Sequence, residues 1–85
     1  PKGVAIENAS LSNHMLWMKE KYDFSYKDKI LQRTSYSFDA SVWELFMPLL
    51  SGAQLIILPS EASNPMTLID IALRSGITKL QLVPT

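Results

Sequence analysis

The chain has 85 residues, of which 47% are hydrophobic and 19% charged, a composition typical of a small globular domain rather than of a disordered segment. Its eight basic and eight acidic residues give no net charge, which argues against nucleic acid and an anionic membrane as partners. The absence of cysteine, and a single histidine without partners at ligand spacing, exclude a disulfide framework, a thiol nucleophile and an ordinary zinc site. The apolar runs are too short to cross a membrane and no signal pattern is present, so we expect a cytoplasmic protein.

The first half of the chain predicts two strands on either side of a helix. Residues 3–7 are expected to form a short strand, because a glycine precedes the β-branched Val4 and Ile6. A helix of about three turns should follow, capped by a polar side chain at its start. Its apolar stripe has helical spacing and consists of Leu11, Met15, Met18 and Tyr22. A second strand begins at Ile30, and its exit reaches Phe38.

A second helix is expected to begin at Ser41. Ser41 and Glu44 have the spacing of a capping box, in which each side chain bonds the backbone amide of the other residue. Pro48 removes an amide inside this helix and predicts a kink or an early end, while Gly52 supplies the terminating residue. The helix is apolar on nearly all sides, so we expect more than one of its faces to be covered.

The second half predicts a strand, a helix and a strand. The continuous apolar run at 53–58 fits the centre of a parallel sheet. Asn64 at the N-cap and Pro65 at the first helical position begin a third helix that Gly76 ends. Its inward stripe is expected to be Met66, Ile69 and Leu73. Residues 77–83 form the last predicted strand, with alternate side chains on opposite faces. One face would carry Leu80 and Leu82, and the other Lys79, Gln81 and Val83.

The alternation of strands and helices predicts an α/β fold of right-handed βαβ units with a mostly parallel sheet. In such sheets ligands lie beyond the carboxyl ends of the strands, where Asp39, Trp43 and Gln81 fall. The sequence does not give the strand order that would make these three residues neighbours. Spacing alone leaves two interpretations of each residue. Asp39 either binds a ligand's cation or stabilises the start of the helix. Trp43 lines either a pocket or the core, and Gln81 contacts either a ligand or water.

Two motifs carry a resemblance to a known family. Residues 38–44 read Phe-Asp-Ala-Ser-Val-Trp-Glu, and residues 49–53 read Leu-Leu-Ser-Gly-Ala. In this order they resemble the adenylation domains of nonribosomal peptide synthetases. Residues 1–4 are similar to the end of that family's phosphate loop, and 77–85 to the segment after its next helix. The resemblance covers the whole chain, which has no starting methionine, and implies a partial adenylation domain over residues 1–85, an internal fragment of the large N-terminal subdomain of a larger adenylate-forming domain.

The resemblance also implies an activity and its partners. The family activates an amino acid with ATP to an aminoacyl adenylate, releases pyrophosphate, and passes the acyl group to a phosphopantetheine thiol on a carrier domain. An adenylate-forming ligase of this kind uses ATP and Mg²⁺ as cofactors. Its partners would be an amino-acid substrate, a peptidyl carrier domain and a C-terminal adenylation subdomain. The later nucleotide motifs and the catalytic lysine of the family are absent, so we expect these 85 residues to be inactive alone.

The resemblance assigns roles to six residues. Asp39 matches the residue that pairs with the α-ammonium group of the substrate. Ala40, Trp43 and Gln81 match positions that face the substrate side chain. Lys2 and Gly3 would lie next to the ATP phosphates, without an assigned catalytic role. The first three of these substrate-facing residues lie in the motif at 38–44, Gln81 lies in the similar segment at 77–85, and the remaining two lie in the segment at 1–4.

The substrate is expected to be glutamine, because the Gln81 amide can pair reciprocally with another amide. Phenylalanine or leucine comes second. Two other functions stay open: a fragment of an acyl- or aryl-CoA ligase of the same superfamily, and a noncatalytic α/β binding or structural subdomain. Asp39 argues against the ligase, whose substrate lacks an amine. A dinucleotide-binding module is excluded, because three isolated glycines cannot form its glycine-rich motif.

Overall fold

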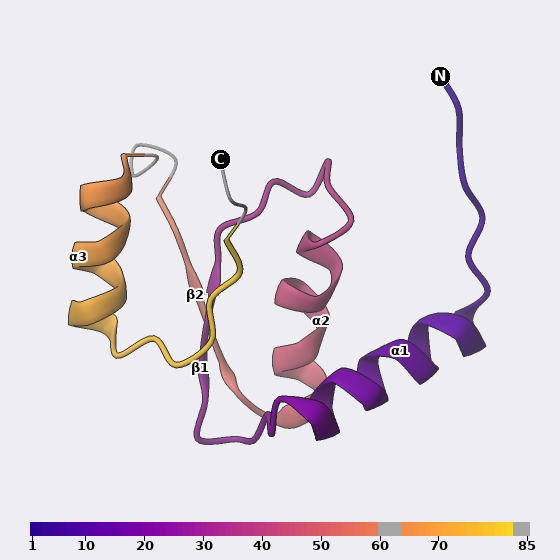
Figure 1. Cartoon of the computed structure of the whole chain (residues 1–85), viewed down its shortest axis with the longest axis horizontal. Helices are drawn as coiled ribbons and strands as arrows, with labels where there is room; N and C mark the ends of the chain where they lie inside the picture. Colours follow the sequence, from indigo (N-terminus) through magenta and orange to yellow (C-terminus); the bar gives the residue numbers. More distant parts are fainter. Residues whose placement is uncertain (60–63, 83–85) are drawn as a thin grey trace.

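The computed structural model describes residues 1–59 and 64–82 and contains, within them, three helices and a two-stranded parallel sheet. The elements in chain order are α1 (Asn8–Lys21), β1 (Lys29–Gln32), α2 (Ser41–Ser51), β2 (Gln54–Ile57) and α3 (Pro65–Ser75). Figure 1 shows α1 and α2 on one side of the sheet and α3 on the other. The predicted α/β class with parallel pairing is confirmed.

β1 lies in the middle of the sheet region. On one side it pairs in parallel with β2, with Lys29 opposite Gln54. On its other side Ile30 forms a parallel bridge with Lys79, in the segment that follows α3. Ile30 and Leu31 are consequently fully buried. This arrangement supplies the strand order that the sequence lacked, because the segment after α3 runs beside β1.

The core lies between α1, α2 and β1. It consists of Met15, Phe24, Ile30 and Met47, with Leu11, Met18, Trp43 and Ala53 packed against it. The predicted stripe of α1 is therefore confirmed at three of its positions. Its fourth member, Tyr22, is half exposed because α1 ends at Lys21 and the chain turns away. None of the described helices is long and apolar enough to cross a membrane.

Two of the predicted strands are not formed as strands. Residues 3–7 are extended without a pairing neighbour among the described residues, and Val4 and Ile6 are exposed. Figure 1 shows this segment leading away from the helices. Within 77–82 the bridge at Lys79 is the one strand-like pairing, and Val83 lies outside the described residues. A strand needs continuous pairing with a neighbour, which a β-rich sequence alone does not supply.

Three predicted helix boundaries are confirmed, but the polar cap expected at the start of α1 is wrong, because its N-cap side chain makes no capping hydrogen bond. Gly52 and Gly76 adopt left-handed backbone angles, with φ of 75° and 69°, and end α2 and α3. The Asn64 side chain accepts a hydrogen bond from the Met66 amide at 2.8 Å, so the predicted N-cap of α3 is confirmed. The early end expected at Pro48 does not occur, because α2 continues to Ser51.

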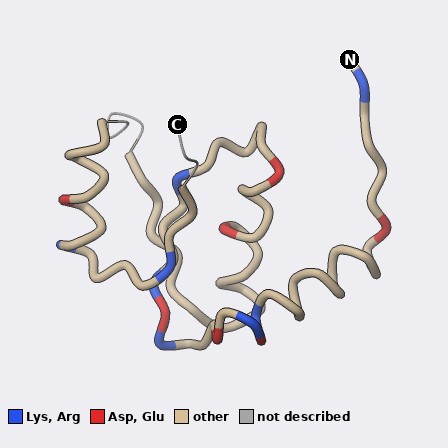
Figure 2. Tube along the Cα trace, viewed as in Figure 1, with Lys and Arg blue, Asp and Glu red and all other residues tan. Residues whose placement is uncertain are grey.

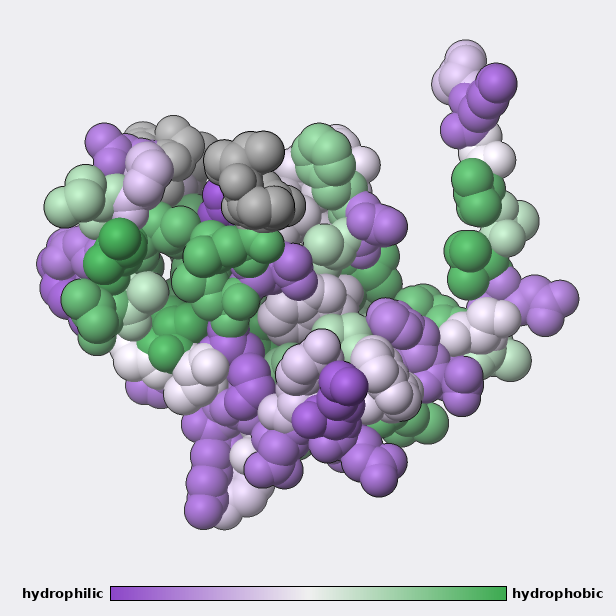
Figure 3. All heavy atoms as spheres, in the orientation of Figure 1, coloured by the Kyte–Doolittle hydropathy of each residue, from purple (hydrophilic) through white to green (hydrophobic). Residues whose placement is uncertain are grey.

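Of two expectations about helix faces, the one for α3 is wrong and the one for α2 is confirmed. The α3 residues expected to face inward, Met66, Ile69 and Leu73, are all exposed. The helix instead buries Leu68 and partly covers Ile71 and Ala72. These three residues are also three and four positions apart, so they form another face of the helix. Figure 3 shows apolar side chains gathered on the surface around α3. α2 packs against α1 and against both strands, so more than one of its faces is covered, and its exposed apolar side is formed by Phe46, Leu49 and Leu50.

Asp28 connects the start of β1 to the segment after α3. Its carboxylate accepts hydrogen bonds from the Thr78 hydroxyl at 2.6 Å, the Lys79 ammonium at 2.9 Å and the Ser25 amide at 2.9 Å. Burial opposes ionisation of Asp28, but the bonds from Thr78, Lys79 and Ser25 outweigh it and lower the pKa below its ordinary value of 3.8. The ionised carboxylate therefore stabilises the fold.

Replacing Asp28 by asparagine should reduce the free energy of unfolding at pH 7 by about 1–3 kcal/mol, because the charge-assisted bonds to Thr78 and Lys79 weaken. A lowered folded-state pKa means that this stabilisation is present above the unfolded pKa and is lost as pH falls through the folded pKa. The wild-type chain should thus lose more stability than Asp28→Asn when the pH falls below 3.8. Urea unfolding at several pH values measures both effects.

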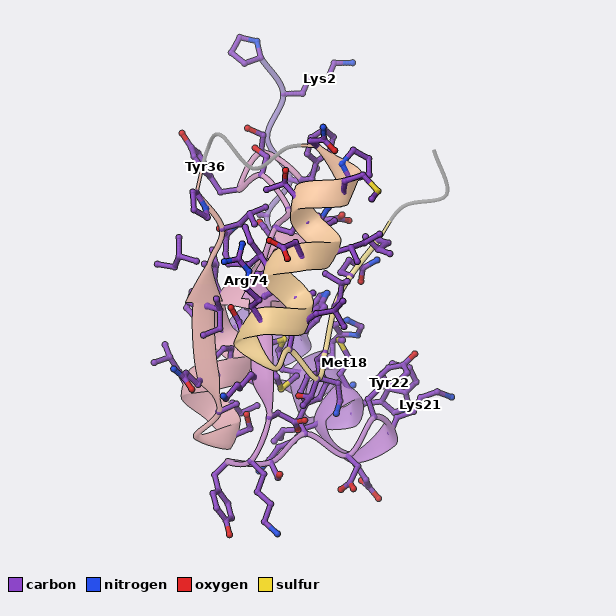
Figure 4. All side chains as sticks on the ribbon, turned by 90° about the vertical axis from the view of Figure 1, so that its left-hand side faces the viewer. Lys2, Met18, Lys21, Tyr22, Tyr36 and Arg74 are labelled. Atoms are coloured by element: carbon purple, nitrogen blue, oxygen red, sulfur yellow. The ribbon has the colours of Figure 1, made fainter. Side chains whose placement is uncertain are left out.

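Asp70→Asn is the matched control, because Asp70 forms an exposed ion pair with Arg74 on α3. Figure 4 shows Arg74 on that helix. A loss of stability at pH 7 as large for Asp70→Asn as for Asp28→Asn would contradict the role given to Asp28.

Candidate functional site

A hollow of about 380 Å³ lies between α1 and the start of α2. Its wall on the α2 side comes from the turn before the helix and the first helical residues. Its wall on the α1 side comes from that helix and the segment preceding it. The lining residues are Ile6, Ser10, Leu11, His14, Met15, Asp39, Ala40, Val42 and Trp43. Three of the sequence-predicted site residues, Asp39, Ala40 and Trp43, therefore share one surface.

Asp39 lies in the turns that lead from β1 into α2. The Phe38 carbonyl beside it accepts hydrogen bonds from the Ser41 amide at 3.1 Å and the Ser41 hydroxyl at 2.7 Å. The Asp39 carbonyl accepts from the Val42 amide at 3.1 Å. The backbone of Asp39 is thus fixed to the first turn of α2. Within the described ranges its exposed carboxylate has no hydrogen bond or ion pair, which leaves it free to bind a cation.

Trp43 and Gln81 are brought together directly. The indole Nε1 of Trp43 donates to Oε1 of Gln81 at 3.1 Å, and Nε2 of Gln81 donates to the Leu82 carbonyl at 3.3 Å. The Trp43 ring also packs against Phe24, with 5.6 Å between ring centroids. A primary amide has two acceptor and two donor positions, so Gln81 keeps one of each for a ligand. With its N–H committed, Trp43 offers only its apolar ring.

The predicted faces of the segment after α3 are supported by these contacts. The Lys79 ammonium lies 5.2 Å from the centre of the Phe24 ring, and Gln81 bonds the neighbouring Trp43. Lys79 and Gln81 therefore point to the same side of the segment. Gln81 does not line the hollow itself but is joined to it through Trp43.

The predicted capping box is wrong at both of its residues. Ala40 already has helical backbone angles, φ −62° and ψ −22°, so it takes the N-cap position and Ser41 is the first residue of α2. The Ser41 hydroxyl donates backwards to Phe38 instead of accepting from the helix. The Glu44 side chain turns away from the helix amides to Arg33 and Thr34. A helical residue at the N-cap cannot direct its side chain to the N3 amide.

The start of α2 carries negative charge without nearby basic residues in the sequence. Asp39 and Glu44 lie here, and no Lys or Arg occurs between Arg33 and Arg74. Figure 2 shows acidic positions in and just before α2, with the basic positions on other elements. Among the residues that line the hollow, Asp39 is the acidic one and no Lys or Arg occurs, so the hollow is suited to a positively charged group. No cluster of three or more His, Asp or Glu residues that could hold a metal ion occurs in residues 1–59 and 64–82.

The structure does not bring Lys2 and Gly3 to the hollow. Both lie in the exposed segment before α1, and an added Cβ at Gly3 would meet no atom within 4 Å. Figure 4 shows Lys2 at the far end of that segment, away from the sheet. Ile6, nearer to α1, is the residue of this segment that lines the hollow.

Sequence reasoning missed three contributors to this region. Ser10 and His14 line the hollow from α1, and Glu44 ties the exit of β1 to α2. The spacing of Ser10 and His14, one helical turn apart, was a usable signal that they share a face. His14 is exposed and stacks on Trp17, with ring centroids 5.9 Å apart.

Comparison with known proteins gives matches over the whole chain. The family model described as AMP-binding enzyme matches residues 1–85. Tyrocidine synthase 3 of Brevibacillus parabrevis is 42% identical, over 100% of this chain and 1% of its own length. Vanchrobactin synthetase VabF of Vibrio anguillarum is 41% identical, over 100% and 3%. Zwittermicin A synthase ZmaJ of Bacillus cereus is 43% identical, over 100% and 16%. The chain thus spans 1% to 16% of the length of these relatives.

Proposed function

Because the chain belongs to the AMP-binding enzyme family, as the resemblance drawn from its sequence predicts, we propose that it is part of an amino-acid-activating adenylation domain. Residues 1–85 would form an internal piece of the large N-terminal subdomain. Similarity to the tyrocidine, vanchrobactin and zwittermicin A synthetases supports a peptide synthetase over an acyl- or aryl-CoA ligase. The reaction consumes ATP, which favours a cytoplasmic location.

The proposed reaction has two steps. In the first, the carboxylate of the amino acid attacks the α-phosphorus of ATP, and the bond to the bridging oxygen breaks with release of pyrophosphate. In the second, the aminoacyl group passes from the adenylate to a carrier-domain thiol, and AMP leaves. Phosphopantetheine on the partner carrier domain would supply this thiol, and Mg²⁺ would neutralise charge on the ATP phosphates. No described residue is assigned to either group.

The observation that carries the proposal is the unengaged carboxylate of Asp39 at the hollow. The carbonyls of Phe38 and Asp39 are bonded to α2, so the backbone that carries the carboxylate is fixed, while the carboxylate is not neutralised by a described residue. An α-ammonium group would gain a charge-assisted hydrogen bond there. A substrate without the amine would gain nothing from Asp39, which distinguishes amino-acid activation from the acyl- and aryl-CoA ligase alternative.

Three other residues would shape the pocket for the substrate side chain. Ala40 leaves space beside Asp39, and Trp43 provides an apolar wall. Gln81 retains one acceptor and one donor position after bonding Trp43 and Leu82. These two free positions match the amide of a glutamine side chain, which pairs reciprocally with another amide. Glutamine is therefore the proposed substrate, with phenylalanine or leucine as the next choices.

Amino-acid-dependent exchange of pyrophosphate into ATP should be strongest with glutamine when the full-length protein is assayed across the amino acids. Replacing Gln81 by leucine should lower the preference for glutamine over leucine by about tenfold, the effect of losing one well-made polar contact. Strong exchange with leucine and none with glutamine would contradict the substrate assignment.

Two controls accompany this assay. Gln54→Leu changes an exposed glutamine on β2, away from the hollow, and should leave the preference unchanged. The isolated 85 residues should give no exchange, because the later nucleotide motifs and the catalytic lysine of the family are absent from them. Exchange by the isolated chain would contradict the proposal that it needs the rest of the domain.

A further inference from the structure

Glu44 is a buried carboxylate whose two oxygens are both engaged by the exit of β1. It has no exposed surface. Oε1 accepts from the backbone amides of Arg33 at 3.1 Å and Thr34 at 2.9 Å, and Oε2 accepts from the Thr34 hydroxyl at 2.7 Å. One side chain in the first turns of α2 therefore holds two consecutive residues of the turn that leads to Asp39.

This arrangement is costly for the fold. The ion pairs between described residues are Lys79 with Asp28 and Arg74 with Asp70, so Glu44 is buried without a cation at salt-bridge distance in those ranges. Burying a carboxylate costs several kcal/mol unless hydrogen bonds replace its water. Three donors from two residues serve this purpose, so both oxygens of Glu44 are bonded, as are the other buried side-chain polar atoms of the described residues.

The contacts of Glu44 fix one end of the segment that carries Asp39. The other end is fixed by Ser41, whose amide and hydroxyl both donate to the carbonyl of Phe38, the residue before Asp39. Between the two ends, the Phe38 amide donates to the Ser35 carbonyl at 2.9 Å. Asp39 thus lies at the end of a short turn region that α2 holds at both ends by its own side chains.

We propose that Glu44 is a positioning residue that, together with Thr34, holds the turns before α2 so that the Asp39 carboxylate faces the α-ammonium group of the substrate. This role rests on the proposed function. Glu44 touches no ligand itself. Its effect passes through the backbone of residues 33–38, and a shift of about 1 Å in a positioned group is enough to lower activity up to 10²-fold.

The test compares five variants of the full-length protein in pyrophosphate exchange: Glu44→Gln, Thr34→Val, Thr34→Ser, Asp39→Asn and the control Glu20→Gln. Glu44→Gln turns one acceptor oxygen into a donor, and Thr34→Val removes the hydroxyl that reaches Oε2. Thr34→Ser restores that hydroxyl. Glu20 is an exposed glutamate on α1. The probes are glutamine and glutaramic acid, which is glutamine without its α-amine. If another amino acid gives stronger exchange, that amino acid and its deaminated acid replace them.

Glu44→Gln and Thr34→Val should raise KM for the amino acid by about tenfold, because the carboxylate no longer faces the amine. KM for ATP and KM for the deaminated acid should not change, since neither ligand uses Asp39. Thr34→Ser and Glu20→Gln should behave as wild type. A residue that only stabilises the fold would lower the melting temperature and affect all three KM values equally, and that pattern would overturn the positioning role.

Asp39→Asn separates this inference from the proposed function. If it removes the advantage of the amino acid over the deaminated acid while Glu44→Gln and Thr34→Val do not, the function stands and the positioning role is wrong. If Asp39→Asn leaves the advantage intact, both fail. Should Glu44→Gln not fold, the comparison of Thr34→Val with Thr34→Ser decides alone.

Discussion

Replacing Asp39 by asparagine is expected to lower kcat/KM for the amino acid by about 10- to 100-fold, with KM for ATP unchanged. Hydrogen bonds to charged groups contribute about 1.5–3 kcal/mol, and each 1.4 kcal/mol corresponds to about tenfold in an equilibrium constant. The Asp39 carboxylate is exposed and makes no hydrogen bond or ion pair with a described residue, so its replacement should not disturb the fold. The substitution should therefore change the kinetic parameters for the amino acid and not those for ATP.

Pyrophosphate exchange by the full-length protein measures this result, with the amino acid and ATP varied separately. Asp70→Asn is the matched control, because it removes one exposed carboxylate from α3, on the opposite side of the sheet from the hollow. Equal kcat/KM values for Asp39→Asn and wild type would contradict the assignment of Asp39. A rise in KM for ATP would place Asp39 in the nucleotide site instead.

Replacing Ile30 by alanine is expected to lower the free energy of unfolding of the chain by about 2–5 kcal/mol, the cost of removing a large aliphatic side chain from a packed core. Ile30 has no exposed surface and belongs to the core cluster with Met15, Phe24 and Met47. It lies on β1, between β2 and the segment after α3. Urea unfolding followed by circular dichroism measures the change.

Ile57→Ala makes the same chemical change on β2, where Ile57 is 70% exposed. Its effect should be within about 0.5 kcal/mol, as for other surface positions. If both variants lost the same stability, β1 would not be the centre of the core.

The arrangement of β1, α2, β2 and α3 was largely predictable because each boundary has a local chemical cause. Gly52 and Gly76 end helices, and Asn64 with Pro65 begins one. The apolar run in β2 and the βαβ order predicted parallel pairing, which is observed. These signals depend on residues close together in the sequence, which is why they are readable from it.

The incorrect predictions concern features that depend on contacts between distant parts of the chain. Whether residues 3–7 form a strand depends on a neighbouring strand, and none of the described residues pairs with them. The face of α3 that turns inward, with Leu68, depends on how the helix packs against the sheet. The sequence pattern allowed two faces, and tertiary packing selected one. Long-range packing is not encoded in local spacing.

The candidate site was also predictable only where its residues are close together in the sequence. The motif around Asp39 and Trp43 placed both beside one hollow, and the spacing along the last segment placed Gln81 on the correct side. The role of Glu44 was hidden, because its spacing from Ser41 equally fits a capping box. Only the backbone angles of Ala40 decide between the two. His14 lines the hollow because α1 packs beside the start of α2, and no sequence motif predicts that packing.

The most direct test of the account is a crystal structure of the full-length protein with its amino-acid substrate and ATP bound. The account predicts that the α-ammonium nitrogen lies within hydrogen-bond distance of an Asp39 carboxylate oxygen, about 2.7–2.9 Å. It also predicts the substrate side chain against the Trp43 ring. An α-ammonium group held by other residues, with the Asp39 carboxylate turned to solvent, would contradict it.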